Sequence, residues 1–176
     1  MPLIRRGEAG PVEILLKRDI AGGIYRLSDI CPNVSTVPEI AQMLEERKLS
    51  SEFIDNIEIE IEDPCDYYAY VNDKEGRIML CKEHLSKSDE KVVYLDIVHE
   101  TVHIIQLHDG RNLFDRRYRY SRRPTEIEAY RVAVNEGRRI GMKEQELFDY
   151  LKVEWISEEE HRELASKLGV RPSYLL

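Results

Sequence analysis

Two histidines four residues apart, with a glutamate directly after the first, are the clearest chemical signal in this chain. They are His99, Glu100 and His103, in the sequence HETVH. On an α-helix, residues i and i+4 lie on one face, about 6 Å apart along the axis. This spacing lets both imidazoles bind one zinc ion at about 2.0–2.1 Å. Glu100 points about 100° away from His99, so we expect it to hold and deprotonate a water molecule rather than to bind the metal.

The residues around this motif predict a long helix over residues 89–107, a segment without Gly or Pro. Ser86 or Ser88 can cap its start, and Asp109 followed by Gly110 is a typical stop signal. Apolar residues surround the motif on nearly every face, so we expect the helix to be buried. The alternative interpretation is a core helix whose two histidines only form hydrogen bonds.

A catalytic zinc site needs a third protein ligand and one open position. The best candidate is Glu126, on a second predicted helix that begins near Pro124 and ends before Gly141. Glu126 is centred on the apolar face of this helix, whereas Glu128 points about 200° away, toward polar residues. A carboxylate on an apolar face is costly to bury unless it is paired or binds a metal. We therefore expect Glu126 to be the ligand and Glu128, the other candidate, to pair with Arg131 at the surface.

The two motifs together resemble those of the zincin metallopeptidases, and among them the gluzincins, in which HExxH is followed by a glutamate on a later helix. The sequence EIEA at 126–129 is similar to the Glu-x-x-Ala of that ligand helix, which also recurs in compact intracellular metallopeptidases that act on phage repressors. The resemblance implies that His99, His103 and Glu126 bind one Zn²⁺ ion. It also implies that Glu100 is the catalytic base of a peptide hydrolase.

One position departs from the gluzincin pattern. Where many gluzincins have Asp or Asn four residues after the ligand glutamate, to orient a zinc-bound histidine, this chain has Tyr130. Such a histidine is expected to have a hydrogen-bond acceptor, so either Tyr130 or another group takes this role. Between the two helices, Tyr118, Tyr120 or His108 could donate a hydrogen bond to the oxyanion that develops during hydrolysis.

Length and composition indicate one catalytic domain, residues 1–176. The chain is 42% hydrophobic with a net charge of −8, and it is long enough to bury a core. No apolar run approaches the ~18 residues of a membrane span, and the apolar stretch at 12–16 is too short for a signal sequence. We expect a cytoplasmic protein with no membrane partner.

Cys31, Cys65 and Cys81 are odd in number and widely spaced, so we expect buried free thiols rather than a disulfide or a zinc cluster.

The order of predicted elements is typical of a zincin-like α+β fold. It contains a small mixed or antiparallel sheet with a backing helix, then the metal-binding helix, then a helical C-terminal subdomain, with the subdomains spanning 1–108 and 109–176. By the resemblance, the strand at 77–81 would be the edge of the cleft, where an extended peptide can add to the sheet; an interior strand is the alternative. The predicted strands are 12–17, 23–27, 57–61, 67–71 and 77–81, and the backing helix is 38–48.

Two further helices are predicted near the C-terminus, at 143–152 and from Ser157 to Gly169, the second with a capping-box sequence. His161 lies among acidic residues at the start of the last helix, and His84 directly follows Lys82 and Glu83. We expect both histidines at the surface rather than as metal ligands.

Residues 111–123 form a loop with six arginines and interspersed tyrosines, in an otherwise acidic chain. Such a surface suits nucleic acid or an acidic protein partner; the alternative is a solvated loop whose arginines pair with carboxylates elsewhere. The sequence therefore leaves three hypotheses. The first is a zinc-dependent peptidase acting on a peptide or protein substrate. The second is a non-catalytic zincin-scaffold module that binds nucleic acid or protein through this loop, and the third combines both activities.

Overall fold

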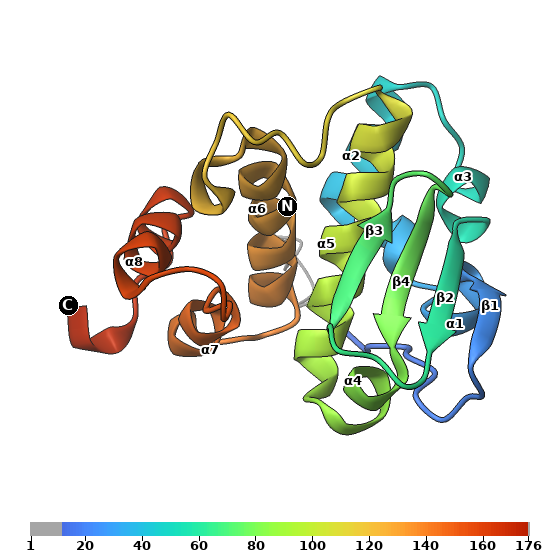
Figure 1. Cartoon of the computed structure of the whole chain (residues 1–176), viewed down its shortest axis with the longest axis horizontal. Helices are drawn as coiled ribbons and strands as arrows, with labels where there is room; N and C mark the ends of the chain where they lie inside the picture. Colours follow the sequence, from blue (N-terminus) through green and yellow to red (C-terminus); the bar gives the residue numbers. More distant parts are fainter. Residues whose placement is uncertain (1–11, 176) are drawn as a thin grey trace, which may run out of the picture.

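The first part of the chain folds into a four-stranded mixed sheet with helices packed on one face (Figure 1). The computed structural model describes residues 12–175. The strand order is β1-β2-β4-β3, with β2 and β4 parallel and the two outer pairs antiparallel. The strands are β1 (Gly23–Arg26), β2 (Glu58–Glu62), β3 (Ala69–Asn72) and β4 (Arg77–Cys81), and the helices are α1 (Leu27–Ile30), α2 (Pro38–Glu46), α3 (Glu52–Asp55), α4 (Lys82–Lys87), α5 (Glu90–His108), α6 (Pro124–Arg139), α7 (Glu144–Tyr150) and α8 (Glu158–Lys167).

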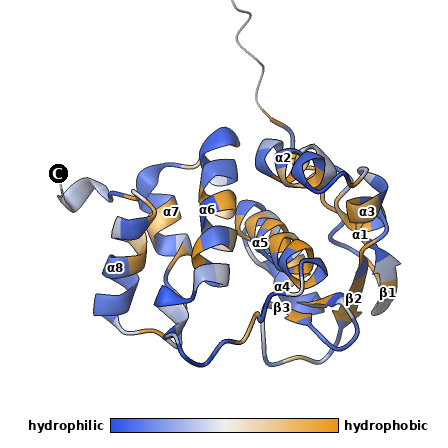
Figure 2. Ribbon diagram, turned by 90° about the horizontal axis from the view of Figure 1, so that it is seen from above, coloured by the Kyte–Doolittle hydropathy of each residue, from blue (hydrophilic) through white to orange (hydrophobic). Residues whose placement is uncertain are grey.

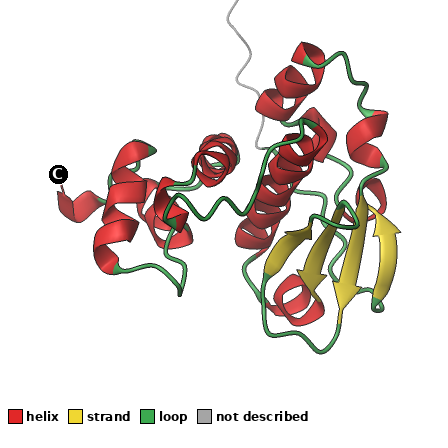
Figure 3. Cartoon of the chain, turned by 45° about the horizontal axis from the view of Figure 1, so that its top comes forward, coloured by secondary structure: helices red, strands yellow, loops and turns green. Residues whose placement is uncertain are grey.

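Alternation of side chains along β2 separates the two faces of the sheet. Ile59 and Ile61 are buried against the helices, and in Figure 2 the hydrophobic positions gather between the sheet and α1, α3 and α5. On the polar face, Arg77 of β4 pairs with Glu58 and Glu60, each at 2.8 Å. Figure 3 shows α5 alongside the sheet, where it contacts β3 and β4.

Helix α5 is buried along most of its length, as predicted, and packs between the sheet and α6. Its N-cap is Asp89, whose side chain accepts hydrogen bonds from the second and third helical amides. The prediction of Ser86 or Ser88 as the cap is therefore wrong. Ser88 instead ends α4, and its hydroxyl contacts His84 Nδ1 at 2.7 Å. Gly110, with φ of 76°, follows the end of α5 as expected.

One prediction about the strands is wrong, and for the strand at 77–81 the interior alternative holds. Residues 12–17 form no strand. The Lys17 amide donates a hydrogen bond to the Ile30 carbonyl at the end of α1. A hydrophobic alternation in the sequence does not by itself provide a neighbouring strand to pair with. The strand at 77–81 is interior rather than at the edge, because the hairpin returns β3 to the outer side of β4. The edge nearest α5 is therefore β3.

The expectation of three free thiols is also wrong. Cys65 and Cys81 form a disulfide, with their Cα atoms 5.7 Å apart, while Cys31 is free and buried. Because β2 and β4 run parallel, with Glu62 paired to Cys81, both strands end at the same edge of the sheet. The loop that follows β2 therefore carries Cys65 next to Cys81, a contact that sequence spacing does not reveal.

Helices α6, α7 and α8 follow, and α6 packs on α5. The capping box at Ser157 is present. His84 and His161, expected at the surface, are both buried: His84 Nε2 lies 2.7 Å from Asp96 Oδ2, and His161 Nε2 lies 2.7 Å from the Phe148 carbonyl. The prediction failed because a helix with many charged residues still packs one face against the core, and both histidines lie on that face. In the part of the chain that the structure describes, no helix is long and apolar enough to cross a membrane.

Candidate metal centre

Three side chains from two helices converge at one point between α5 and α6. His99 Nε2 and His103 Nε2 lie 3.0 Å apart, and Glu126 Oε2 lies 3.1 Å from the first and 3.3 Å from the second. All three side chains are buried. The helical phase explains the convergence, since residues 99 and 103 share a face of α5 and Glu126 is in the first turn of α6, which packs against it.

The three atoms fit a metal ion. A tetrahedral ion with ligands at about 2.05 Å separates any two of them by about 3.3 Å, which is close to the observed spacing. Two imidazole nitrogens and a carboxylate oxygen are also the donor set of catalytic zinc sites. Two neutral imidazoles whose lone pairs face each other at 3.0 Å require a cation or a proton between them. The group can therefore hold a metal ion.

Protons balance the charges of this group when no metal is bound. Burial alone would raise the pKa of Glu126, but hydrogen bonds from His103 and His99 lower that pKa well below its usual range. Burial opposes the charged form of His103, yet its hydrogen bond to Glu126 raises its pKa to about 9. A cation that binds here would displace such protons.

Glu100 lies beside the three converging side chains without joining them. It is 8% exposed and lines a cavity of about 350 Å³ together with His99, His103 and Glu126. Burial raises the pKa of the Glu100 carboxyl group. Its position in the same cavity, but outside the group of possible ligands, agrees with the angle expected from the helix.

Sequence reasoning missed Gln106, which is fully buried. Its side-chain oxygen lies 2.7 Å from His103 Nδ1, so we assign the proton to Nδ1, which leaves Nε2 free to bind a metal. A polar residue three positions after a ligand histidine, in an otherwise apolar run, is the signal that could have found it.

Glu128 has a different role from the one predicted. It does not pair with Arg131; it accepts a hydrogen bond from Gln106 Nε2 at 2.7 Å and forms an ion pair with Arg111. The prediction failed because it considered partners on the same helix only. The result is a continuous chain of contacts from Arg111 through Glu128 and Gln106 to His103.

Of the four side chains proposed to support the site, the structure brings two to it. The Tyr130 ring lies 4.2 Å from the His99 ring, and the Tyr130 hydroxyl is 2.7 Å from that of Tyr120, which lines the cavity. Tyr118 and His108 are exposed and do not line it. His99 Nδ1 is buried and has no hydrogen-bond partner among residues 12–175, so Tyr130 packs against this histidine but does not accept its proton.

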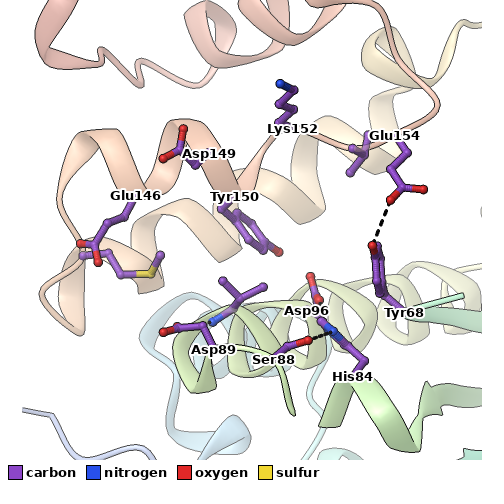
Figure 4. A pocket seen from close by; sticks show the side chains of 13 residues that line it. Tyr68, His84, Ser88, Asp89, Asp96, Glu146, Asp149, Tyr150, Lys152 and Glu154 are labelled. Atoms are coloured by element: carbon purple, nitrogen blue, oxygen red, sulfur yellow. Dashed lines mark hydrogen bonds and ion pairs between the residues drawn. The ribbon is translucent and has the colours of Figure 1, made fainter. Parts of the chain in front are cut away.

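Two larger cavities continue from the metal-site cavity. The first, of about 500 Å³, shares Tyr67, Ala69 and Trp155 with it, and the second, of about 510 Å³, shares Tyr68, His84, Ser88 and Glu154 with the first. Five carboxylate side chains and one lysine are among the residues that line the second cavity (Figure 4). Tyr68 bridges this space by donating a hydrogen bond to Glu154 at 3.1 Å. Residues of β3 line the metal-site cavity and the first of the two larger cavities but not the second.

Comparison of the chain with protein-family models, with curated proteins and with solved structures found no match.

Proposed function

We propose that this chain is a zinc-dependent peptidase with a zincin-like fold of the gluzincin type. His99, His103 and Glu126 would hold the zinc ion, and Glu100 would be the general base. The observation that carries the proposal is the convergence of two imidazole nitrogens and a carboxylate oxygen within 3.3 Å of one another, in a cavity that Glu100 also lines. The fourth position that a catalytic zinc ion needs would face this cavity.

The chemistry then divides between the metal and the chain. When bound, zinc lowers the pKa of a water molecule toward about 7 and polarises the scissile carbonyl group. The Glu100 carboxylate accepts a proton from the attacking water and passes it to the leaving amine. Burial raises the pKa of Glu100, which suits a group that must take up a proton and release it again.

Tyr120 is the best placed of the predicted donors for the developing oxyanion. It lines the cavity, and its hydroxyl is held by Tyr130 at 2.7 Å. Burial raises the pKa of Tyr120 well above 10, so the hydroxyl keeps its proton at neutral pH; this proton can reach the oxyanion when Tyr130 is the donor in the bond between the two hydroxyls.

The shape of the site supports an extended peptide as the substrate. Ala69, Tyr70 and Val71 of β3 line the metal-site cavity, and β3 is at the edge of the sheet. An edge strand offers backbone groups to a peptide that adds to the sheet. Two further cavities of about 500 and 510 Å³ continue from the metal-site cavity through shared lining residues and offer more space for the rest of a chain.

The test separates metal binding from hydrolysis. A mixture of synthetic peptides is incubated with the zinc-loaded chain, and the products are read by mass spectrometry. Glu100→Gln is expected to keep its zinc and lose hydrolysis, whereas Glu45→Gln, which alters an exposed glutamate on α2 that lines none of these cavities, is expected to cleave at the parent rate. If Glu100→Gln also cleaves at the parent rate, the proposed mechanism is wrong.

The second candidate function, binding of nucleic acid through residues 111–123, has weaker support. Four of the six arginines in this loop have a carboxylate partner: Arg111, Arg117, Arg122 and Arg123. Arg116 and Arg119 are exposed and form no ion pair with any residue that the structure describes. Two free cations are a small electrostatic surface for a polyanion. This candidate predicts binding that falls steeply with salt and does not require Glu100.

A further inference from the structure

The N-terminus of α6 lacks the hydrogen-bond acceptors that usually cap a helix. Arg123 is the N-cap and its side chain makes no capping bond; Pro124 has no amide proton. The amides of Thr125 and Glu126 have no acceptor within residues 12–175, and the first bonded amide is that of Ile127, to the Arg123 carbonyl at 3.0 Å. Free amides and the helix dipole make such an end favourable for an anion.

Thr125 gives a second, independent indication of a ligand. The residue is only 4% exposed, yet its hydroxyl has no hydrogen-bond partner among the described residues. Thr101, in the middle of α5, shows the usual solution, a bond from its hydroxyl to the Ile97 carbonyl one turn earlier at 2.8 Å. Thr125 is the second residue of α6 and has no preceding helical turn to bond. A buried hydroxyl without a partner is unfavourable, and a bound acceptor would remove the penalty.

A pocket of about 250 Å³ lies at this helix end, and three arginines are among the residues that line it. Thr125 lines it, with Arg111, Arg117, Arg123 and one acidic residue, Asp115. Each of these arginines also has a carboxylate partner, Glu128 for Arg111, Asp115 for Arg117 and Glu126 for Arg123, so a bound anion would share its donors with these ion pairs. The guanidinium groups also suit an oxyanion with several oxygens, because each presents a planar fork of donors.

We propose that this pocket is a binding site for a phosphate group. A phosphate monoester carries about −1.5 to −2 charges at neutral pH and presents three strong acceptor oxygens, so it can accept from several donors at once, whereas a carboxylate presents two. The phosphate oxygens accept from the Thr125 hydroxyl, the free amides of α6 and the arginine forks. The site goes beyond the proposed peptidase activity and does not depend on it.

The pocket adjoins the metal centre through one shared side chain. Arg123 lines both cavities, and its Nη1 lies 3.8 Å from Glu126 Oε1, the oxygen that does not face the histidines. Thr125 directly precedes Glu126 in the chain. A phosphate group bound here would therefore lie beside the metal-binding side chains and would be attached either to a substrate or to a separate small molecule.

The test is calorimetric titration of the full-length, zinc-loaded chain with inorganic phosphate, O-phosphoserine and acetate at constant ionic strength. We expect saturable binding of one phosphate per chain. Thr125→Val, which keeps the shape of the side chain, should weaken binding about tenfold, and Arg123→Gln should weaken it more. Arg116→Gln removes the same charge from an exposed position of the same loop that does not line the pocket, and it should bind like the parent.

The arms of this experiment distinguish the sources of the ligand. Tighter binding of O-phosphoserine than of inorganic phosphate would assign the site to a phosphorylated molecule, and the reverse would assign it to free phosphate; both support the proposal. The double variant His99→Ala/His103→Ala should still bind phosphate, and loss of binding there would place the anion on the metal and overturn the proposal. It would also be overturned by equal affinity for acetate, by unchanged binding in Thr125→Val, or by equal weakening in Arg116→Gln.

Discussion

The side-chain oxygen of Gln106 lies 2.7 Å from Nδ1 of His103, about one turn further along the same buried helix. The contact orients the imidazole so that Nε2 faces His99 and Glu126. The Gln106 side chain is in turn held in place by Glu128, whose carboxylate accepts a hydrogen bond from Gln106 Nε2. If His103 binds a metal ion as proposed, the centre would depend on a residue that is not one of its ligands.

Replacement of Gln106 by Leu should weaken zinc binding about 10- to 100-fold, the range typical of groups that orient metal ligands. The measurement is competition with a chromophoric zinc chelator. Gln42→Leu, which changes an exposed glutamine on α2, is the control and should leave the affinity unchanged. Equal affinities of the Gln106→Leu variant and the parent would show that the hydrogen bond to His103 does not support the site.

The two glutamates of α6 should differ in their effect on zinc. Glu126→Ala removes a proposed metal ligand and should lower the zinc affinity by more than about 100-fold. Glu128→Ala removes only the hydrogen-bond partner of Gln106 and should lower the zinc affinity by about 10- to 100-fold. The same chelator competition measures both variants. A larger loss for Glu128→Ala than for Glu126→Ala would reverse the assignment of the third ligand.

The metal-free chain should lose stability as the pH rises above neutral. The pKa of His103 is raised to about 9 in the folded chain, against about 6.5 in an unfolded one. The folded state therefore holds the proton more tightly, and this stabilisation is complete below pH ~6.5 and lost as the pH rises through about 9.

Urea unfolding in the presence of a chelator, at pH 6 and at pH 9.5, measures this effect. The free energy of unfolding should fall more for the parent than for His103→Gln, which has no imidazole to titrate. Zinc affinity should change in the opposite direction and rise with pH, because the metal binds the deprotonated imidazole. A parent and a variant that differ by the same amount at both pH values would contradict the raised pKa.

A buried hydrogen bond between α5 and α6 should contribute to stability. The Tyr94 hydroxyl donates to Glu136 Oε1 at 2.6 Å, and Arg139 pairs with the same carboxylate at 2.7 Å. Tyr94→Phe should lower the free energy of unfolding by about 1.5–3 kcal/mol, the range for hydrogen bonds to charged groups. Tyr25→Phe, which removes an exposed hydroxyl bond to the Ala21 carbonyl, should change it by less than about 0.5 kcal/mol. Urea denaturation measures both changes, and an equal loss of unfolding free energy in the two variants would argue against the role of Tyr94.

The three cysteines should differ in their reaction with iodoacetamide. Burial raises the pKa of Cys31 to about 12, so its thiol stays protonated and unreactive at pH 8. Cys65 and Cys81 are paired in the disulfide. Mass spectrometry of the oxidised chain should find no modified cysteine in the native state, one after unfolding, and all three after unfolding with a reductant. Modification of Cys65 without a reductant would contradict the disulfide.

Local periodicity accounts for what could be predicted from the sequence. The positions of α5 and α6, the shared face of His99 and His103, and the choice of Glu126 over Glu128 all follow from the helical repeat, which acts over a few residues. The alternation in β2 likewise indicates its buried face. These features need no knowledge of which elements are neighbours in space.

The errors concern contacts between elements that are distant in sequence. The disulfide of Cys65 depends on the parallel pairing of β2 with β4, and the edge position of β3 depends on the strand order. The link from Gln106 to Glu128 depends on how α6 packs against α5. Neither composition nor spacing carries this information, because strand order and helix packing are properties of the whole fold.

The most direct test of the metal centre is the zinc content of the purified chain, measured by elemental analysis after dialysis against a zinc-containing buffer and then a zinc-free one. We predict one zinc ion per parent chain and none in the double variant His99→Ala/His103→Ala. A parent chain that retains no zinc, or a double variant that retains as much as the parent, would contradict the account.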